Sequence, residues 1–367
     1  MEKAKISAIQ LFAMMFIFDL GTAVVVSYGI DAGKDAWLAI LFGMCGGIVL
    51  LFIYYLLFRQ YPTLPLTGYA IKIFGKYLGG IVGLLYIFYF LYIAARNVRD
   101  FSELLISSTL TETPLLVVHI TFVLVVCFVL YLGIEVLGRT AEVFIVILLL
   151  FGATGYFFIL VSGTIEFRHL RPFLENGWKP ILTTAFPFLT DVPFGEMIVF
   201  TMLVPYLNRP KLLKKVWLSA LVSSGLILGF TAALNIAVLG VEVMERATFP
   251  SLATIGRVNL LEFIQRLDAI VVFTLLITVF FKVSIFLYSA VIGVVDLFKL
   301  KNHRPILLPA GGTLIFSSMM IASNYSEHIE EGRYVVGPYF HTVFFIILPL
   351  LMVFVSIIRN RFNKKTN

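Results

Sequence analysis

The sequence predicts an all-α integral membrane protein with about ten transmembrane helices, and three observations carry this prediction. The 367 residues are 60% hydrophobic and 13% charged, with a mean hydropathy of +0.99, whereas about a quarter of the residues in soluble domains are charged. Apolar runs longer than about 18 residues, each able to cross about 30 Å of hydrocarbon as a helix, recur along the chain. Because backbone groups in lipid need internal partners, these runs are expected to be helical. The short alternating segments of a membrane β-barrel are not found.

The expected spans are separated by short connections that contain Gly, Pro and charged residues. Their approximate ranges are 7–30, 37–58, 78–108, 115–133, 141–162, 181–206, 216–240, 267–298, 305–323 and 337–358. Two further segments, 63–76 and 247–266, are expected along the inner and outer membrane surfaces, the second as a surface or re-entrant helix. No stretch has the composition of a separate soluble domain, so residues 1–367 are expected to form a single transmembrane domain.

Basic residues are distributed unevenly between the connections on the two sides. If the N-terminus is cytoplasmic, 17 of the 28 Lys and Arg residues fall in inner connections and 8 in outer ones, as the positive-inside rule requires. Both termini are therefore expected to be cytoplasmic. Because the basic residues lie between apolar runs, the net charge of +7 indicates membrane topology and not nucleic-acid binding.

The chain shows no catalytic or metal-binding pattern. Its five histidines are scattered without ligand spacing, and no Gly-rich phosphate loop or nucleophile elbow is present. Cys45 and Cys127 both lie inside apolar runs and are interpreted as buried thiols rather than a disulfide or a metal site. Neither an enzymatic activity nor a cofactor is expected.

The most informative positions are those where two spans break their own pattern. Residues 19–22 (Asp-Leu-Gly-Thr) interrupt the first span, and residues 190–196 (Thr-Asp-Val-Pro-Phe-Gly-Glu) interrupt the sixth. Ionisable groups at membrane depth are costly unless they have a function or a partner. Interrupted helices at corresponding positions of two halves point to a transporter-type fold with inverted repeats. The two repeats would cover about 7–162 and 181–358.

An unwound helix at mid-membrane suggests a specific chemistry. The second half of the helix begins with free N–H groups and the positive end of its dipole, which can hold a carboxylate. The first half ends with free carbonyls, which can hold an ammonium group or a cation. Together these groups would suit an α-amino acid, with its carboxylate near residues 21–23. The alternative is that Asp19 and Gly21 form only a kink packed against neighbouring helices.

Lys282 stands deep in the eighth span and needs a carboxylate or carbonyl partner. The candidate carboxylates are Glu196, Asp191 and Asp19, and the sequence does not choose among them. The functional hypothesis is that Lys282 fills a place where related transporters hold a cation, so that the site needs no sodium. The alternative is a structural ion pair between the sixth and eighth spans, and both interpretations can hold together.

Four charged residues lie toward the end of the third span. Arg96 and Asp100, and likewise Arg99 and Glu103, are spaced four apart, so each pair can meet on one helix face. A solvated helix end or a vestibule wall accounts for them without a further role. Tyr89 lies deeper in the same helix and is a candidate for lining a central pocket, although core packing or lipid contact is the ordinary interpretation of such a tyrosine.

In this order, the motifs resemble the endospore-germination permease-like proteins, the B subunits of spore nutrient (germinant) receptors, within the amino acid–polyamine–organocation superfamily. The resemblance covers essentially the whole chain. The residues that carry it are Asp19-Leu20-Gly21-Thr22, Phe74-Gly75-Lys76-Tyr77, Arg99, Glu103, Leu170-Arg171-Pro172, Gly177, Pro193-Phe194-Gly195-Glu196, Pro205, Phe249-Pro250-Ser251, Arg266-Leu267-Asp268 and Lys282.

The resemblance implies a LeuT-like 5+5 fold with broken helices one and six. It also implies a sensor in the inner spore membrane that acts with an A subunit and a lipoprotein C subunit. Such a subunit binds a nutrient, commonly an amino acid, and starts germination. The family's pocket would map onto Gly21, Tyr89, Ile93, Phe194 and Gly195. This chain departs from some members in having Asp19 before a Leu-Gly-Thr-Ala run, and in having Lys282.

The favoured function is therefore the nutrient-binding subunit of a germinant receptor, whose broken helices shift on binding. An amino-acid or polyamine secondary transporter of the same fold is the first alternative, and a scaffold or ion path that binds no nutrient is the second. The candidate ligand-binding residues are Asp19, Gly21, Thr22, Tyr89, Ile93, Asp191, Phe194, Gly195, Glu196 and Lys282. Expected partners are the small nutrient, the A and C subunits and the lipid bilayer.

Overall fold

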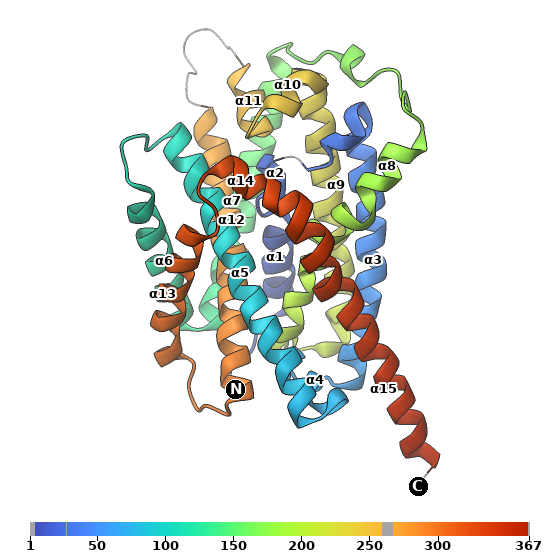
Figure 1. The fold of residues 1–367 in the computed structure, drawn as a ribbon. Helices are drawn as coiled ribbons and strands as arrows, with labels where there is room; N and C mark the ends of the chain where they lie inside the picture. Colours follow the sequence, from blue (N-terminus) through green and yellow to red (C-terminus); the bar gives the residue numbers. More distant parts are fainter. Residues whose placement is uncertain (1–3, 27, 259–266, 366–367) are drawn as a thin grey trace.

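The computed structural model describes residues 4–26, 28–258 and 267–365 and is an almost wholly helical bundle (Figure 1). In this part of the chain, eight helical segments are long and apolar enough to cross a membrane. They are Ala8–Val26, Ile30–Gln60, Lys76–Ser108, Leu115–Leu132, Ile134–Val161, Pro210–Leu239, Asp268–Leu297 and Tyr325–Asn360. Each corresponds to one of the ten predicted spans, with boundaries that differ mostly at the helix ends.

The predicted sixth span is present as a chain of short, irregular helices. They are α8 (Trp178–Thr184), η3 (Ala185–Phe194), η4 (Gly195–Met202) and η5 (Val204–Tyr206). Residues Phe186 and Val192 have non-helical backbone angles, and η3 carries Pro193, which lacks the N–H of a regular helix. The break predicted from the sequence is therefore confirmed. It extends further than residues 190–196, because nearly the whole span departs from regular α-helix.

The predicted ninth span is α13 (Arg304–Met320), a helix of 17 residues. Two smaller predictions concern surface segments. The segment 63–76 contains the short helix α4 (Leu66–Phe74). In the segment 247–266, α11 (Pro250–Gly256) is a short helix, whereas residues 259–266 lie outside the described part of the chain.

The first span consists of α1 (Ala8–Leu20) and α2 (Ala23–Val26). Ser7 and Gln10 form a capping box, since the Ser7 hydroxyl accepts the Gln10 N–H at 3.1 Å and the Gln10 side chain accepts the Ser7 N–H at 2.8 Å. The helix ends at Gly21, whose φ of +38° is unfavourable for residues with a Cβ. The predicted interruption of the first span is confirmed at this residue.

The broken helices form the centre of the bundle (Figure 1). Helix α1 packs against α7 (Ile134–Val161), α9 (Leu213–Leu239) and α12 (Asp268–Leu297), and α12 also packs along α5 (Lys76–Ser108). The remaining elements are α3 (Ala36–Gln60), α6 (Leu115–Leu132), α10 (Val241–Arg246), α14 (Tyr325–Glu331), α15 (Leu348–Lys365), η1 (Ile30–Asp35), η2 (Phe167–Leu170), η6 (Pro210–Leu212) and η7 (Gly332–Ile347). The marked chain ends lie at the same end of the bundle (Figure 1), as an even number of crossings requires.

Small residues allow the irregular sixth span to approach α3. A Cβ added at Gly43 would lie 2.7 Å from the Leu189 Cβ, and one at Gly47 would collide with Phe194. Close backbone approach at small residues is a common basis of helix packing in membranes, because lipid provides no hydrophobic drive for association. The glycines of α3 therefore place the break of the sixth span against the bundle.

Candidate functional site

A cavity of about 530 Å³ lies at the end of the bundle away from the chain termini. We call this end of the bundle outer and the end with the chain termini inner. The cavity wall is built from the outer connections and from the middle of the spanning helices. The wall residues that matter most here are Thr22, Ile93, Arg96, Asp100, Glu196 and Lys282. They come from the break of the first span, from α5, from η4 and from α12, so the cavity lies between the two broken helices and their neighbours.

Lys282 and Glu196 form an ion pair at the deep end of this cavity. Their side chains are only 1% and 4% exposed. The Lys282 ammonium also lies 5.4 Å from the centre of the Phe18 ring, within reach of a cation–π contact. One helical turn away on α12, the Thr278 hydroxyl donates to the Gly21 carbonyl at 2.8 Å. Helix α12 thus contacts both breaks, and Glu196 is the carboxylate that Lys282 contacts.

The other two carboxylate candidates lie behind the cavity wall. Asp19 accepts a hydrogen bond from the Ser224 hydroxyl, and Asp191 accepts one from the Thr342 hydroxyl at 2.9 Å. Both side chains are fully buried, and in the described part of the chain the second oxygen of each has no hydrogen-bond partner. Each carboxyl group therefore holds a broken helix against a neighbouring helix and does not face the cavity in this conformation.

At the break of the first span, the structure offers a ligand less than the sequence predicted, both in free N–H groups and in space. The Gly21 N–H donates to the Ile17 carbonyl at 3.1 Å, so it is not free to hold a carboxylate. A Cβ at Gly21 would lie 2.7 Å from the Lys282 Cδ, which makes glycine necessary here for space as well as for φ. Thr22 does line the cavity, and its hydroxyl lies 3.2 Å from the Tyr28 hydroxyl. Burial is the main cause that raises the pKa of the Tyr28 phenol far above its usual range, so the phenol stays protonated.

Of the two α5 residues predicted to line the pocket, Tyr89 and Ile93, Ile93 lines the cavity. Tyr89, one turn deeper, is buried behind the wall, where it hydrogen-bonds to His341 and stacks on Phe344 with ring centres 4.0 Å apart. His341 itself lines the cavity, so Tyr89 is connected to the cavity only through its hydrogen bond to His341.

In the sixth span, Phe194 and Gly195 are likewise buried outside the lining. Four of the ten candidates, Thr22, Ile93, Glu196 and Lys282, thus meet at the cavity.

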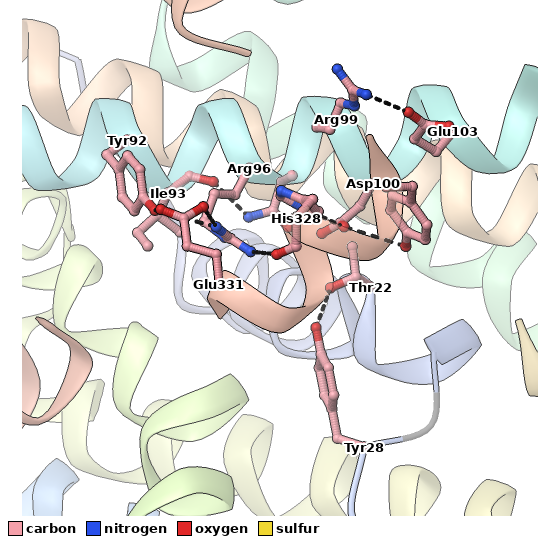
Figure 2. Close-up of polar contacts among 12 residues, drawn as sticks. Thr22, Tyr28, Tyr92, Ile93, Arg96, Arg99, Asp100, Glu103, His328 and Glu331 are labelled. Atoms are coloured by element: carbon pink, nitrogen blue, oxygen red, sulfur yellow. Dashed lines mark hydrogen bonds and ion pairs between the residues drawn. The ribbon is translucent and has the colours of Figure 1, made fainter. Parts of the chain in front are cut away.

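The mouth of the cavity contains a charged cluster (Figure 2), in which Arg96 and Asp100 form part of the wall, as the vestibule interpretation expected, but have partners on α14 that the sequence did not predict. Arg96 on α5 forms an ion pair with Glu331 on α14 at 3.0 Å and donates to the His328 carbonyl. Asp100 contacts the His328 ring nitrogen Nε2 at 2.9 Å. The ion pair of Arg96 is thus with Glu331 and not with Asp100, the residue four positions further along α5.

By contrast, the predicted pair on the same helix, Arg99 with Glu103, is present at 2.7 Å. The polar run before the last span, residues 324–333, was the available signal for a partner of Arg96. Nothing in the sequence linked that run to α5, more than 200 residues earlier.

Several known proteins resemble the chain. A family model described as spore germination protein matches residues 5–326. The chain is 40% identical to spore germination protein KB of Bacillus subtilis (strain 168), covering 100% of this chain and 98% of that protein. It is 25% identical to spore germination protein YndE of the same organism, over 76% of this chain and 80% of YndE.

Among solved structures, it matches Mhp1, a nucleobase-cation-symport-1 family transporter in a closed conformation with bromovinylhydantoin bound. The TM-score is 0.65 at 16% identity, and the match covers 88% of this chain and 73% of the transporter.

The likeness to Mhp1, at this identity, concerns the fold, and it confirms the LeuT-like arrangement with breaks in the first and sixth spans. The similar proteins are named as spore germination proteins and as a transporter, not as enzymes. The apolar spans make the chain an integral membrane protein. Because the family model covers most of the chain and protein KB aligns with all of it, the chain belongs to the family of spore germination proteins.

Proposed function

We propose that this chain is the nutrient-sensing subunit of a spore germinant receptor and that it binds a small nutrient, an amino acid, in the outer cavity. The observation that carries the proposal is the buried Lys282–Glu196 pair at the deep end of a cavity between two broken helices. Ionisable groups at membrane depth mark functional sites by default. Family membership and the 40% identity to spore germination protein KB support a role in germination.

The proposed ligand contacts are Thr22, Ile93, Glu196 and Lys282, which line the cavity. The other candidates are proposed to shape the site from behind its wall: Asp19, Gly21, Tyr89, Asp191, Phe194 and Gly195. A ligand favours closure only if it binds the closed arrangement more tightly than the open one. We propose that this difference in affinity arises at the breaks, because the first and sixth spans are both irregular in their backbone and both contribute residues to the cavity lining.

The proposed setting is the inner spore membrane, with the A and C receptor subunits as partners and both termini cytoplasmic. The excess of Lys and Arg in the inner connections supports this orientation, as does the placement of both chain ends on one side (Figure 1). Residues 1–367 are proposed to act as one transmembrane domain with repeats at about 7–162 and 181–358. A secondary transporter of the same fold is the alternative function, and the likeness to a transporter structure favours keeping it.

The test fills the cavity without changing charge. Ile93→Phe enlarges a side chain that lines the cavity, and Leu91→Phe makes the same kind of change two residues away on α5, outside the lining. Spores that lack the native gene would be complemented with each variant and exposed to a panel of amino acids and sugars. Loss of refractility is followed, and receptor abundance is checked by blot.

We expect Ile93→Phe to shift the nutrient dose–response to concentrations about tenfold higher or more, which corresponds to about 1.4 kcal/mol of binding free energy. Leu91→Phe should respond as the unchanged protein does. An unaltered response in Ile93→Phe at normal abundance would show that the nutrient does not bind in this cavity. Gly21→Ala is unsuitable for this test, because its Cβ meets Lys282 and its φ is strained whether or not a ligand binds there.

A further inference from the structure

The ion pair at the deep end of the cavity has the chemistry of a recognition element. Lys282 and Glu196 are both almost fully buried, yet both contribute to the cavity wall. Removing two charges from water costs several kcal/mol per ion, which their mutual attraction repays only with good geometry and further hydrogen bonds. A ligand with one positive and one negative charge can replace Glu196 as the partner of Lys282 and replace Lys282 as the partner of Glu196. This exchange is possible because both side chains line the cavity, whereas a pair sealed in the protein core could not be reached by a ligand.

Building on the proposed function, we propose that the ligand is a zwitterionic α-amino acid that inserts into the Lys282–Glu196 pair. Its carboxylate takes the ammonium of Lys282, and its ammonium takes the carboxylate of Glu196. One ion pair becomes two, and no buried charge is left without a partner. The exchange is non-covalent and needs no cation from solution, because Lys282 supplies the positive charge itself.

The charges around the pair restrict the ligand class. At the mouth of the cavity, Arg96 is paired with Glu331, and Asp100 is in contact with His328. A ligand at the deep end therefore meets one cation and one anion that those mouth pairs do not engage. The carboxyl group of Asp19 lies near both, behind the wall, where the Ser224 hydroxyl donates to it. An uncharged sugar would gain nothing by separating Lys282 from Glu196, and a polyamine would leave Lys282 without a counter-charge. A dicarboxylate would leave Glu196 without one. Only a molecule with one charge of each sign balances both groups.

The two partners stand on elements of different regularity, which connects binding to movement. Lys282 lies midway along α12, a continuous helix of 30 residues. Glu196 is the second residue of η4, directly after the irregular η3. Inserting a ligand between them must move Glu196 away from Lys282, and the broken span has the softer backbone. Binding at this pair would therefore displace the sixth span relative to α12.

The experiment compares four purified proteins in lipid nanodiscs: the unchanged chain, Lys282→Met, Glu196→Gln and the double variant. Binding is measured by calorimetry with L-alanine, L-valine, D-glucose and spermidine. Alaninamide, which lacks the carboxylate, and propionate, which lacks the ammonium, serve as matched probes. Thermal unfolding of each protein is recorded in parallel, since each single change leaves one charge buried and unpaired.

We expect the unchanged chain to bind an amino acid and to bind neither matched probe nor spermidine. Each single variant should lose about a hundredfold or more in affinity, because one charge of the bound amino acid would then be buried without a partner. The double variant should recover thermal stability relative to the single variants, since no charge stays unpaired, but it should not recover amino-acid binding.

Three results would overturn the inference. If the double variant regains amino-acid affinity together with stability, the pair is only a structural link between η4 and α12. If the unchanged chain binds glucose, and the double variant binds it equally well, the ligand is uncharged; the inference then fails while the proposed nutrient sensor stands. If the unchanged chain binds no probe and Ile93→Phe leaves germination unaltered, the proposed function fails and the inference falls with it.

Discussion

The outer and inner halves of the bundle are held together by different forces. On the outer side, charged side chains meet around a cavity, as Arg96 does with Glu331 (Figure 2). On the inner side, the segment before the first span pairs with the segment after the sixth through the backbone. The Ile6 N–H donates to the Tyr206 carbonyl, and the Asn208 N–H donates to the Ile6 carbonyl, each at 3.0 Å.

Between the cavity and this inner contact, aromatic packing also joins the two broken helices. The rings of Phe18 in α1 and Phe200 in η4 meet edge to face with centres 5.2 Å apart, and both side chains are fully buried. Partly exposed ion pairs contribute little net stability and exchange readily with water or ligand. Apolar packing of buried rings is lost only at a larger cost in free energy. The difference indicates that the outer half can rearrange while the inner ends of the two broken helices stay joined.

The largest effect is expected from removing the inner aromatic contact. Phe200→Ala deletes a fully buried ring between the two broken helices. Such truncations cost about 3–5 kcal/mol, so the thermal unfolding transition in detergent should move to clearly lower temperature. Phe316→Ala is the matched control, because that ring, on α13, is 67% exposed. Equal stability of the two variants would contradict the view of the inner half as the rigid one.

A smaller effect on stability is expected at the mouth of the cavity. Glu331→Gln removes the charge that pairs with Arg96, whose side chain is 10% exposed while that of Glu331 is 34% exposed. The loss of unfolding free energy should be about 1 kcal/mol or less. Dissociation of bound amino acid should nevertheless become faster, because the contact between α5 and α14 is weakened.

Radiolabelled amino acid in nanodiscs measures this rate. The control is Glu103→Gln, which removes the charge paired with Arg99 outside the cavity lining. If that control speeds dissociation as much as Glu331→Gln does, the pair at the mouth has no special role in retaining ligand.

The sequence was sufficient for what depends on local composition. Apolar length fixes where the spans lie, and Gly21 and Pro193 locate the breaks, because backbone freedom and the missing N–H act at the residue itself. The sequence could not predict pairs of residues that meet only because their helices pack together. The sequence offered Lys282 three carboxylate partners without choosing among them, and only the side-by-side placement of η4 and α12 selects Glu196. The partner of Arg96 was missed for the same reason.

The smallest effect is expected from locking the inner half. Cysteines introduced as Ile6→Cys and Leu207→Cys lie on paired segments. Neighbouring paired strands are about 4.8 Å apart, which is within the range of about 4.4–6.8 Å between Cα atoms that a disulfide spans. The native thiols would be removed by Cys45→Ala and Cys127→Ala, so that any disulfide formed on oxidation joins the introduced pair.

Because a sensor needs only the outer half to respond, the oxidised protein should bind amino acid with the affinity of the reduced one. Neither form should accumulate labelled amino acid in proteoliposomes. The alternative function predicts the opposite, since an alternating-access transporter must separate the inner ends of its broken helices to release substrate inside. Uptake by the reduced protein that stops on oxidation and returns with reductant would identify a transporter. Loss of binding on oxidation would show that the inner ends also move when the outer half closes, which the backbone contacts of Ile6 argue against.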